Sequence, residues 1–183
     1  MRPLVLAFIS SEDNIKNLEA IRLSNLKRAG QYSGDVPTIG DKAIVWLSYG
    51  VHGNEASSQN AAVKTMHELL TSDNPATKEW LENTVIIMDP AVNPDGYNRY
   101  ANWVRQASNS ILNANPVSRE HQEPWPGGRV NHYLFDLNRD WAWCTQVESQ
   151  QRIVQYRKWL PHVHVDFHEQ GYENPYYLSL IHI

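Results

Sequence analysis

The most constraining feature of this sequence is an apolar run, Ala43 to Tyr49, that leads directly into the segment Gly50 to Glu55, Gly-Val-His-Gly-Asn-Glu. The run has the length and composition of a buried strand, and an amphipathic helical pattern follows it to about Leu70. His52 and Glu55 therefore stand where a strand ends and a helix begins. This position directs an imidazole and a carboxylate into one space.

Strands and helices alternate along the rest of the chain. Pro3 to Ile9 and Thr84 to Met88 read as strands, Ser11 is a plausible N-cap for a helix through about Ala29, and a further helix is expected from about Val147 to Leu160. This order predicts an α/β fold with a mixed, largely parallel central sheet flanked by helices. Ligands gather at the carboxyl ends of such strands, which is where His52 lies.

Composition limits the classes of protein that need to be considered. The 183 residues suffice for a single domain, residues 1–183, and carry a formal net charge of -4. The basic residues are scattered, so we expect no nucleic-acid partner, and no segment has the length of a membrane span. One cysteine, Cys144, excludes an internal disulfide and a cysteine-based zinc site.

His52 and Glu55 are suitable ligands for zinc, which in catalytic sites takes three protein ligands and leaves a position for water. A third ligand must come from elsewhere in the chain. The segment from His162 to Glu169 alternates strictly, so that one face of a strand carries His162, His164, Asp166 and His168.

Two segments between these sites have a loop composition. Asn93-Pro94-Asp95-Gly96 is a strong turn signal. From about Gln106 to His132 the sequence lacks periodicity and is rich in proline and glycine, which predicts a long loop. Trp103 and Trp125 favour an ordered loop that packs over another part of the domain.

Four motifs in order resemble those of the zinc metallocarboxypeptidases, the carboxypeptidase A-like family. They are His52-Gly53-Asn54-Glu55, Asn93 to Gly96, Asp136-Leu137-Asn138-Arg139-Asp140-Trp141 and Asp166-Phe167-His168. The resemblance implies a zinc-dependent hydrolase that removes C-terminal residues from peptides, with a secreted or periplasmic location.

The same resemblance implies His52, Glu55 and His168 as the zinc ligands; two histidines and a glutamate are the established set of carboxypeptidase A. His168 is preferred to His164 because it matches the motif and lies at the strand end. His162 and His164 are expected to be ordinary strand histidines. Asp166 either supports a ligand histidine or makes a structural hydrogen bond.

Asn138 and Arg139 match the family's grip on the free C-terminal carboxylate of a peptide, since a guanidinium binds a carboxylate through two parallel hydrogen bonds. The competing interpretation pairs Arg139 with Asp136 or Asp140 in a structural turn. Arg105 matches the arginine that polarises the scissile carbonyl, and Arg99 is a competitor for that role.

The family's catalytic glutamate lies well downstream of the third zinc ligand, and Glu169 and Glu173 are too close to His168 to match it. We therefore expect a fragment truncated at both ends, with little or no peptidase activity. Residues 178–183 depart from the family pattern, and part of a transposase-end sequencing adaptor, CTGTCTCTTATACACATC, encodes them. We expect this segment to be a non-native tail.

Two alternatives share the metal site. One is a zinc deacylase or amidase that acts on acylated amino acids or cell-wall peptides. The other is a non-catalytic module that binds zinc or peptide without turnover. Substrate assays on the complete protein would distinguish these alternatives from a carboxypeptidase.

Overall fold

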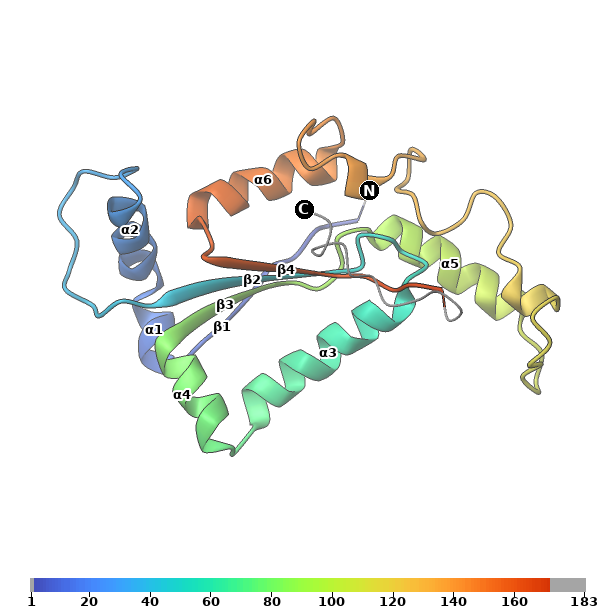
Figure 1. Cartoon of the computed structure of the whole chain (residues 1–183), viewed down its shortest axis with the longest axis horizontal. Helices are drawn as coiled ribbons and strands as arrows, with labels where there is room; N and C mark the ends of the chain where they lie inside the picture. The colour runs from blue at the N-terminus through green and yellow to red at the C-terminus, as the bar shows by residue number, and fades with distance from the viewer. Residues whose placement is uncertain (1, 172–183) are drawn as a thin grey trace, which may run out of the picture.

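The structure, a computed structural model, describes residues 2–171 and contains a four-stranded sheet in the order β1-β3-β2-β4 (Figure 1). The strands are β1 (Ala7–Ile9), β2 (Ala43–Tyr49), β3 (Thr84–Asp89) and β4 (Val163–Phe167). β2 runs parallel to both β3 and β4, and β1 pairs antiparallel with β3. The predicted mixed, largely parallel sheet is confirmed.

Helices cover both faces of the sheet, with α6 on one side and α3 on the other (Figure 1). In chain order they are α1 (Glu12–Lys16), α2 (Leu18–Arg28), α3 (Ala56–Thr71), α4 (Pro75–Asn83), α5 (Pro94–Ala107) and α6 (Val147–Trp159), with 3-10 turns η1 (Arg119–His121) and η2 (Leu137–Arg139).

The alternation of side chains along β2 divides the core into two clusters. Trp46 packs with Ile21 of α2 and Trp159 of α6 on one face of the sheet. Tyr49 packs with Ala62 of α3 and other apolar residues on the opposite face. Because successive strand residues point to opposite faces, one short apolar strand supports both helical layers.

The helix expected from Ser11 to Ala29 is two helices. Ser11 caps α1 as predicted, and its side chain accepts a hydrogen bond from the backbone N–H of Asn14. The helix breaks at Asn17, whose side-chain amide donates to the carbonyl of Asp13. Asparagine offers the backbone such local alternatives to a helical ladder, which explains the break.

The segment Asn93 to Gly96 differs from the predicted turn, because it begins helix α5. Asn93 is the N-cap, with its side-chain oxygen 2.9 Å from the N–H of Gly96, and Pro94 occupies the first helical turn. Asparagine at the cap followed by proline is a favourable helix start, so the same residues serve a helix as well as a turn.

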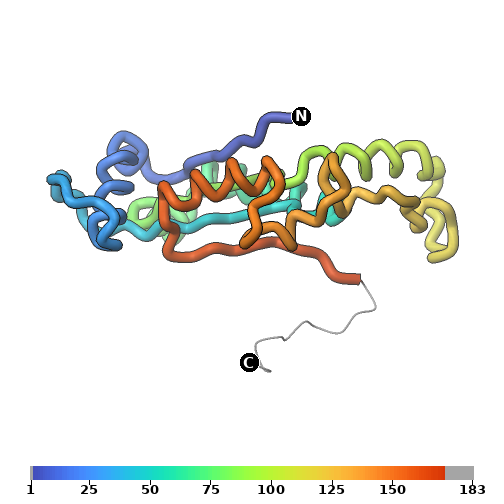
Figure 2. Tube along the Cα trace, turned by 90° about the horizontal axis from the view of Figure 1, so that it is seen from above, coloured from blue at the N-terminus to red at the C-terminus, as the bar shows by residue number. Residues whose placement is uncertain are grey.

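The predicted loop is present after α5 and projects beyond the end of the sheet in two perpendicular views (Figures 1 and 2). Its later part returns to α5, where the Arg99 guanidinium donates to the carbonyl oxygens of Gly127, Val130 and Asn131. Trp125 is 84% exposed, so this side chain does not pack over the domain as expected.

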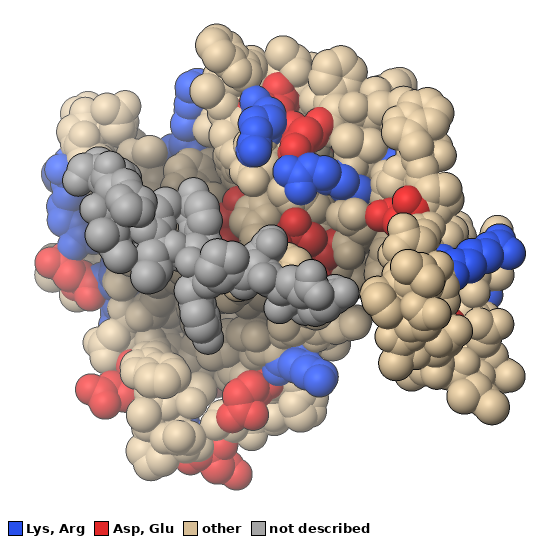
Figure 3. Space-filling view, turned by 45° about the vertical axis from the view of Figure 1, so that its right-hand side comes forward, with Lys and Arg blue, Asp and Glu red and all other residues tan. Residues whose placement is uncertain are grey.

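On the face shown in Figure 3, Lys and Arg side chains are interspersed with Asp and Glu side chains. Within residues 2–171, no helix combines the length and apolar character that crossing a bilayer requires. The tail predicted over residues 178–183 lies outside the described residues.

Candidate metal centre

The turn after β2 is fixed by contacts with the turn after β3. Gly50 has a φ of 68°, a left-handed conformation that glycine adopts without strain. The backbone N–H of Val92 donates to the carbonyl of Tyr49 at 3.0 Å, and that of Asn93 donates to Gly50 at 3.1 Å. The segment that carries His52 is therefore held against the neighbouring strand end.

Gly53 permits a close approach of three backbone segments. A Cβ atom at this position would collide with the backbone of Gly96 and Tyr97 in α5 and with the carbonyl oxygen of Gly128. Because any side chain would push these segments apart, glycine between His52 and Asn54 is required for the packing of the turn.

His168 reaches the same end of the sheet because β4 runs parallel to β2. The register pairs Tyr49 with Phe167, and their rings stack with centroids 4.3 Å apart. His168 therefore comes directly after the end of β4. This is the same end of the sheet at which the chain leaves β2 and continues to His52.

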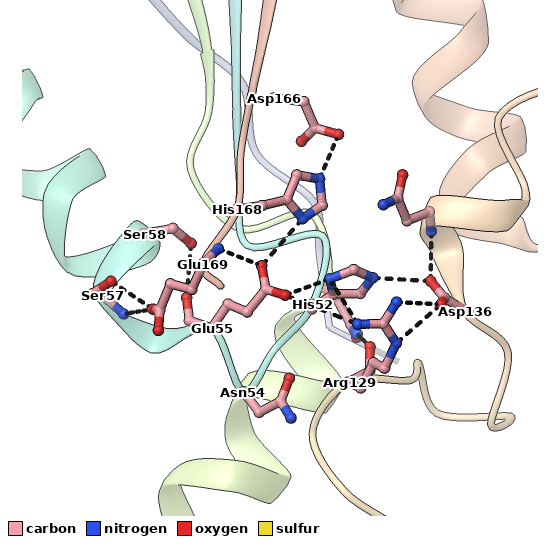
Figure 4. A network of polar contacts seen from close by, with 12 residues as sticks. His52, Asn54, Glu55, Ser57, Ser58, Arg129, Asp136, Asp166, His168 and Glu169 are labelled. Carbon is pink, nitrogen blue, oxygen red and sulfur yellow. Dashed lines mark hydrogen bonds and ion pairs between the residues drawn. The ribbon is translucent and has the colours of Figure 1, made fainter. Parts of the chain in front are cut away.

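The structure brings His52, Glu55 and His168 together (Figure 4). Nδ1 of His52 lies 2.7 Å from Oε1 of Glu55, and Nδ1 of His168 lies 3.1 Å from Oε2 of the same carboxylate. One ligand atom from each residue lies within 4.8 Å of the other two. The two imidazoles thus present their Nδ1 atoms to opposite oxygens of one carboxylate.

The other nitrogen of each imidazole faces a second carboxylate. Nε2 of His52 lies 3.1 Å from Oδ1 of Asp136, and Nε2 of His168 lies 3.0 Å from Oδ2 of Asp166. Carboxylates in this position orient metal-binding histidines and raise their basicity. Asp166 contacts His168, as the first of its two interpretations requires, and its support of a metal ligand stays a prediction.

This set of atoms fits zinc. Ligand atoms at Zn–N and Zn–O distances near 2.0–2.1 Å in a tetrahedral site are roughly 3.3 Å apart. The Glu55 contacts to the histidines, at 2.7 and 3.1 Å, use different carboxylate oxygens, and one donor atom of each residue lies within 4.8 Å of the other two. Two nitrogens with one carboxylate suit a borderline-soft cation. Three carboxylates around two imidazoles also supply negative charge that a dication neutralises.

The protonation equilibria follow from the same contacts. Burial alone would raise the pKa of Glu55, but hydrogen bonds from His168, His52 and the N–H of Glu169 outweigh it and lower that pKa to about 2. Hydrogen bonds to Asp166 and Glu55 raise the pKa of His168 to about 10. In the absence of metal, a proton on His168 compensates the negative charge of Glu55.

His164 lies in β4, whereas His162 falls one residue before the strand, and both make structural contacts. Nδ1 of His162 accepts the backbone N–H of Ile44 at 3.0 Å, and Nε2 of His164 lies 2.9 Å from Oγ of Ser48. The His164 ring also packs edge-on against Trp141, and burial lowers its pKa. Neither histidine belongs to the group around Glu55, in agreement with the expectation for both.

Arg129 lies beside the group, and the sequence interpretation did not include it. Its guanidinium is 3.4 Å from Nδ1 of His52 and 4.0 Å from Oε1 of Glu55, and it pairs with Asp136 at 2.9 Å. The side chain is 46% exposed and thus accessible to a bound molecule. The signal was weak, since Arg129 follows two glycines in a loop 77 residues from His52.

Neither Arg105 nor Arg99 lies beside the group formed by His52, Glu55 and His168. The start of α5 packs against the His52 turn, whereas Arg105 lies in the last turn of that helix and is exposed. The nine residues from Gly96 to Arg105 correspond to roughly 14 Å along the helix axis. Arg99 donates to the carbonyls of the returning loop and is used structurally.

Asn138 and Arg139 lie in η2, adjacent to Asp136. The backbone N–H of Asn138 donates to Oδ1 of Asp136 at 2.9 Å, which fixes η2 to the carboxylate that contacts His52. Within residues 2–171, Arg139 is exposed and forms no ion pair; its guanidinium donates to the carbonyl of Asn138. The competing pairing with Asp136 or Asp140 is therefore not observed in the described part of the chain.

Comparisons with known proteins agree with the resemblance to zinc metallocarboxypeptidases. Residues 2–159 match the model of the family described as zinc carboxypeptidase, a range that includes His52 and Glu55 and ends before β4. Carboxypeptidase A2 of Rattus norvegicus is 36% identical over 62 residues, which cover 33% of this chain and 15% of the relative.

Solved carboxypeptidase structures share the fold. A putative carboxypeptidase A from Shewanella denitrificans OS-217 aligns over 92% of this chain and 32% of its own length, at a TM-score of 0.56 and 17% identity. The carboxypeptidase A from Helicoverpa armigera aligns over 93% of this chain and 38% of its own, at a TM-score of 0.50 and 16% identity. The chain thus spans about a third of the length of these structures.

The family match covers most of the chain, and the sheet is similar to that of solved carboxypeptidases. The family model includes the segment that supplies the first two residues of the metal-binding group. The chain belongs to the zinc carboxypeptidase family.

Proposed function

We propose that this protein is a zinc-dependent metallocarboxypeptidase that removes C-terminal residues from peptides, with His52, Glu55 and His168 as the zinc ligands. The convergence of these three side chains at one end of the sheet carries the proposal. When bound, zinc supplies a Lewis acid and lowers the pKa of a coordinated water. In keeping with the family, we propose that the protein acts in a secreted or periplasmic compartment.

The neighbouring side chains bind and orient the substrate. Arg139 and Asn138 hold the terminal carboxylate, which is supported by the absence of an ion pair at Arg139 among residues 2–171. Arg129 polarises the scissile carbonyl, because its partly exposed guanidinium lies within 4.0 Å of Glu55. Arg105 stays a prediction from the motif, and its place on α5 favours Arg129 for this role.

The carboxylates next to the metal group are already engaged among the described residues. Asp136 and Asp166 face the two histidines, and Glu169 accepts hydrogen bonds from Ser57. Because each of the three already has a partner, we assign none of them as the base that takes a proton from the attacking water. We therefore propose that this chain by itself binds zinc and has little or no peptidase turnover.

Zinc stoichiometry tests the proposal directly. The purified chain is dialysed against buffered zinc, and bound metal is measured by mass spectrometry for the wild type, His168→Ala and His164→Ala. We expect one zinc per chain in the wild type and in His164→Ala, and loss of most bound zinc in His168→Ala. His164 is the matched control because it lies in β4, the strand that leads to His168, and contacts Ser48 instead.

Three results would contradict the proposal. If the wild-type chain takes up no zinc, the metal centre is not formed by these residues. Equal zinc binding by His168→Ala and the wild type would exclude His168 as the third ligand. Turnover of a peptide by this chain, abolished by a chelator, would show that the catalytic base lies within it.

A further inference from the structure

We infer that Glu169 is a positioning residue that holds the metal group together by capping helix α3 from the end of β4. The inference rests on the proposed zinc site. Glu169 does not bind the metal in this arrangement, because its side chain points toward Ser57 and away from the two imidazoles (Figure 4). Its effect on zinc passes through the positions of Glu55 and His168.

Helix α3 lacks a cap from its own N-cap residue. Glu55 occupies the N-cap position, and its side chain makes no capping hydrogen bond because both oxygens face histidines. A helix start leaves its first backbone N–H groups without partners, and a side chain at the N-cap normally accepts one from the second or third helical residue. The use of Glu55 in the metal group therefore leaves this requirement unmet.

Glu169, the residue after His168, supplies the missing cap of α3. Its Oε1 accepts the backbone N–H of Ser57 at 2.7 Å and the Ser57 hydroxyl at 2.5 Å. Ser57 is the second residue of α3, the position that an N-cap side chain would bond. The negative charge also lies at the positive end of the helix dipole.

The same residue ties the third ligand to the first two. The pairing of β2 with β4 ends at Phe167, so His168 lies one residue beyond the ladder. The backbone N–H of Glu169 donates to Oε2 of Glu55 at 2.9 Å, while its side chain is fixed on α3. Glu169 thus holds His168 and Glu55 at a fixed separation through two independent contacts.

Zinc affinity measured by competition with a chelator tests this role. We expect Glu169→Ala to weaken zinc binding about tenfold, the lower end of the range for residues that orient metal ligands. Glu169→Gln keeps an oxygen that accepts from Ser57 and is expected to recover part of the affinity. Glu169→Asp is too short to reach Ser57 and is expected to resemble Glu169→Ala.

Asn74→Ala provides the matched control. Asn74 caps α4 through its side-chain oxygen, 2.9 Å from the N–H of Ala76, and lies outside the metal group. Both alanine variants remove one helix cap, but only Glu169→Ala is expected to change zinc affinity. The visible absorption of the Co²⁺-substituted chain gives a second readout, which should change in Glu169→Ala and stay as in the wild type in Asn74→Ala.

The outcomes separate this inference from the proposed function. Wild-type affinity and an unchanged Co²⁺ spectrum in Glu169→Ala would overturn the positioning role while leaving the zinc site intact. An equal loss of affinity in Asn74→Ala would also overturn it, because the effect would then be a general loss of stability. Failure of the wild-type chain to bind zinc would instead refute the proposed function.

Discussion

His52 and Asp136 lie 84 residues apart in the chain, and a contact of 3.1 Å joins Nε2 of the imidazole to Oδ1 of the carboxylate. Asp136 also accepts the backbone N–H of Asn138, so the carboxylate connects the first proposed zinc ligand to the proposed substrate-binding turn. Burial opposes ionisation of Asp136, but the N–H of Asn138 and the neighbouring His52 outweigh it and lower its pKa. The Asp136 carboxyl group is therefore ionised at neutral pH.

Asp136→Asn is expected to weaken zinc binding about 10- to 100-fold, the usual effect of losing a carboxylate that orients a ligand histidine. The substitution keeps the shape of the side chain and removes the charge that faces Nε2 of His52. Competition with a chelator measures the change. Asp73→Asn, which removes a surface partner of Lys78, is the control and should bind zinc as the wild type does. Unchanged affinity in Asp136→Asn would contradict the proposed support of His52.

Arg129→Ala is expected to lower kcat/KM on a peptide substrate by about 10²- to 10³-fold, the effect of removing one donor that stabilises a developing oxyanion. Arg105→Ala is expected to have a small effect, because Arg105 lies in the last turn of α5. The measurement uses the full-length gene product and a peptide with a free C-terminus. A larger loss in Arg105→Ala than in Arg129→Ala would restore the role that the motif assigns to Arg105.

Gly53→Ala is expected to destabilise the chain by about 1–3 kcal/mol or more, the range for inserting atoms into a packed interior. Its Cβ would overlap the backbone of α5, which cannot move as a flexible side chain would. Gly40→Ala is the control, since a Cβ there meets no atom within 4 Å and its effect should stay within about 0.5 kcal/mol. Urea denaturation measures both variants, and equal midpoints would contradict the close packing at Gly53.

The metal-free chain is expected to lose stability on both sides of a range between about pH 4.5 and 6.5. Glu55 has its pKa lowered from 4.5 to about 2, so its contribution is present above pH 4.5 and lost as the pH falls through 2. His168 has its pKa raised from 6.5 to about 10, so its contribution is present below pH 6.5 and lost as the pH rises through 10.

Thermal midpoints in the presence of a chelator measure this dependence. Both shifts report partly the same contact between Glu55 and His168, so they do not add. Glu55→Gln is the test variant, in which both limbs should weaken; part of the acid limb should remain because the pKa of Asp136 is also lowered. A pH profile in Glu55→Gln identical to that of the wild type would contradict the assignment of these limbs.

The sequence was sufficient for the features that depend on local patterns. The apolar run of β2, the cap at Ser11 and the alternation of β4 are readable because strand and helix periodicities and cap chemistry act over a few residues. The break at Asn17 and the helix start at Asn93 were missed, since asparagine favours caps and turns alike. The order of the family motifs in the sequence indicates His52, Glu55 and His168, and the fold brings the three side chains together.

Only the tertiary structure could place Arg129 beside His52 and Glu169 on Ser57. These contacts join residues 77 and 112 positions apart, and such pairs leave no periodic trace in a sequence. They depend on the parallel register of β2 and β4 and on the return of the loop to α5. The family motifs in the sequence indicate the proposed ligands, whereas the side chains that support them are selected by packing between distant segments.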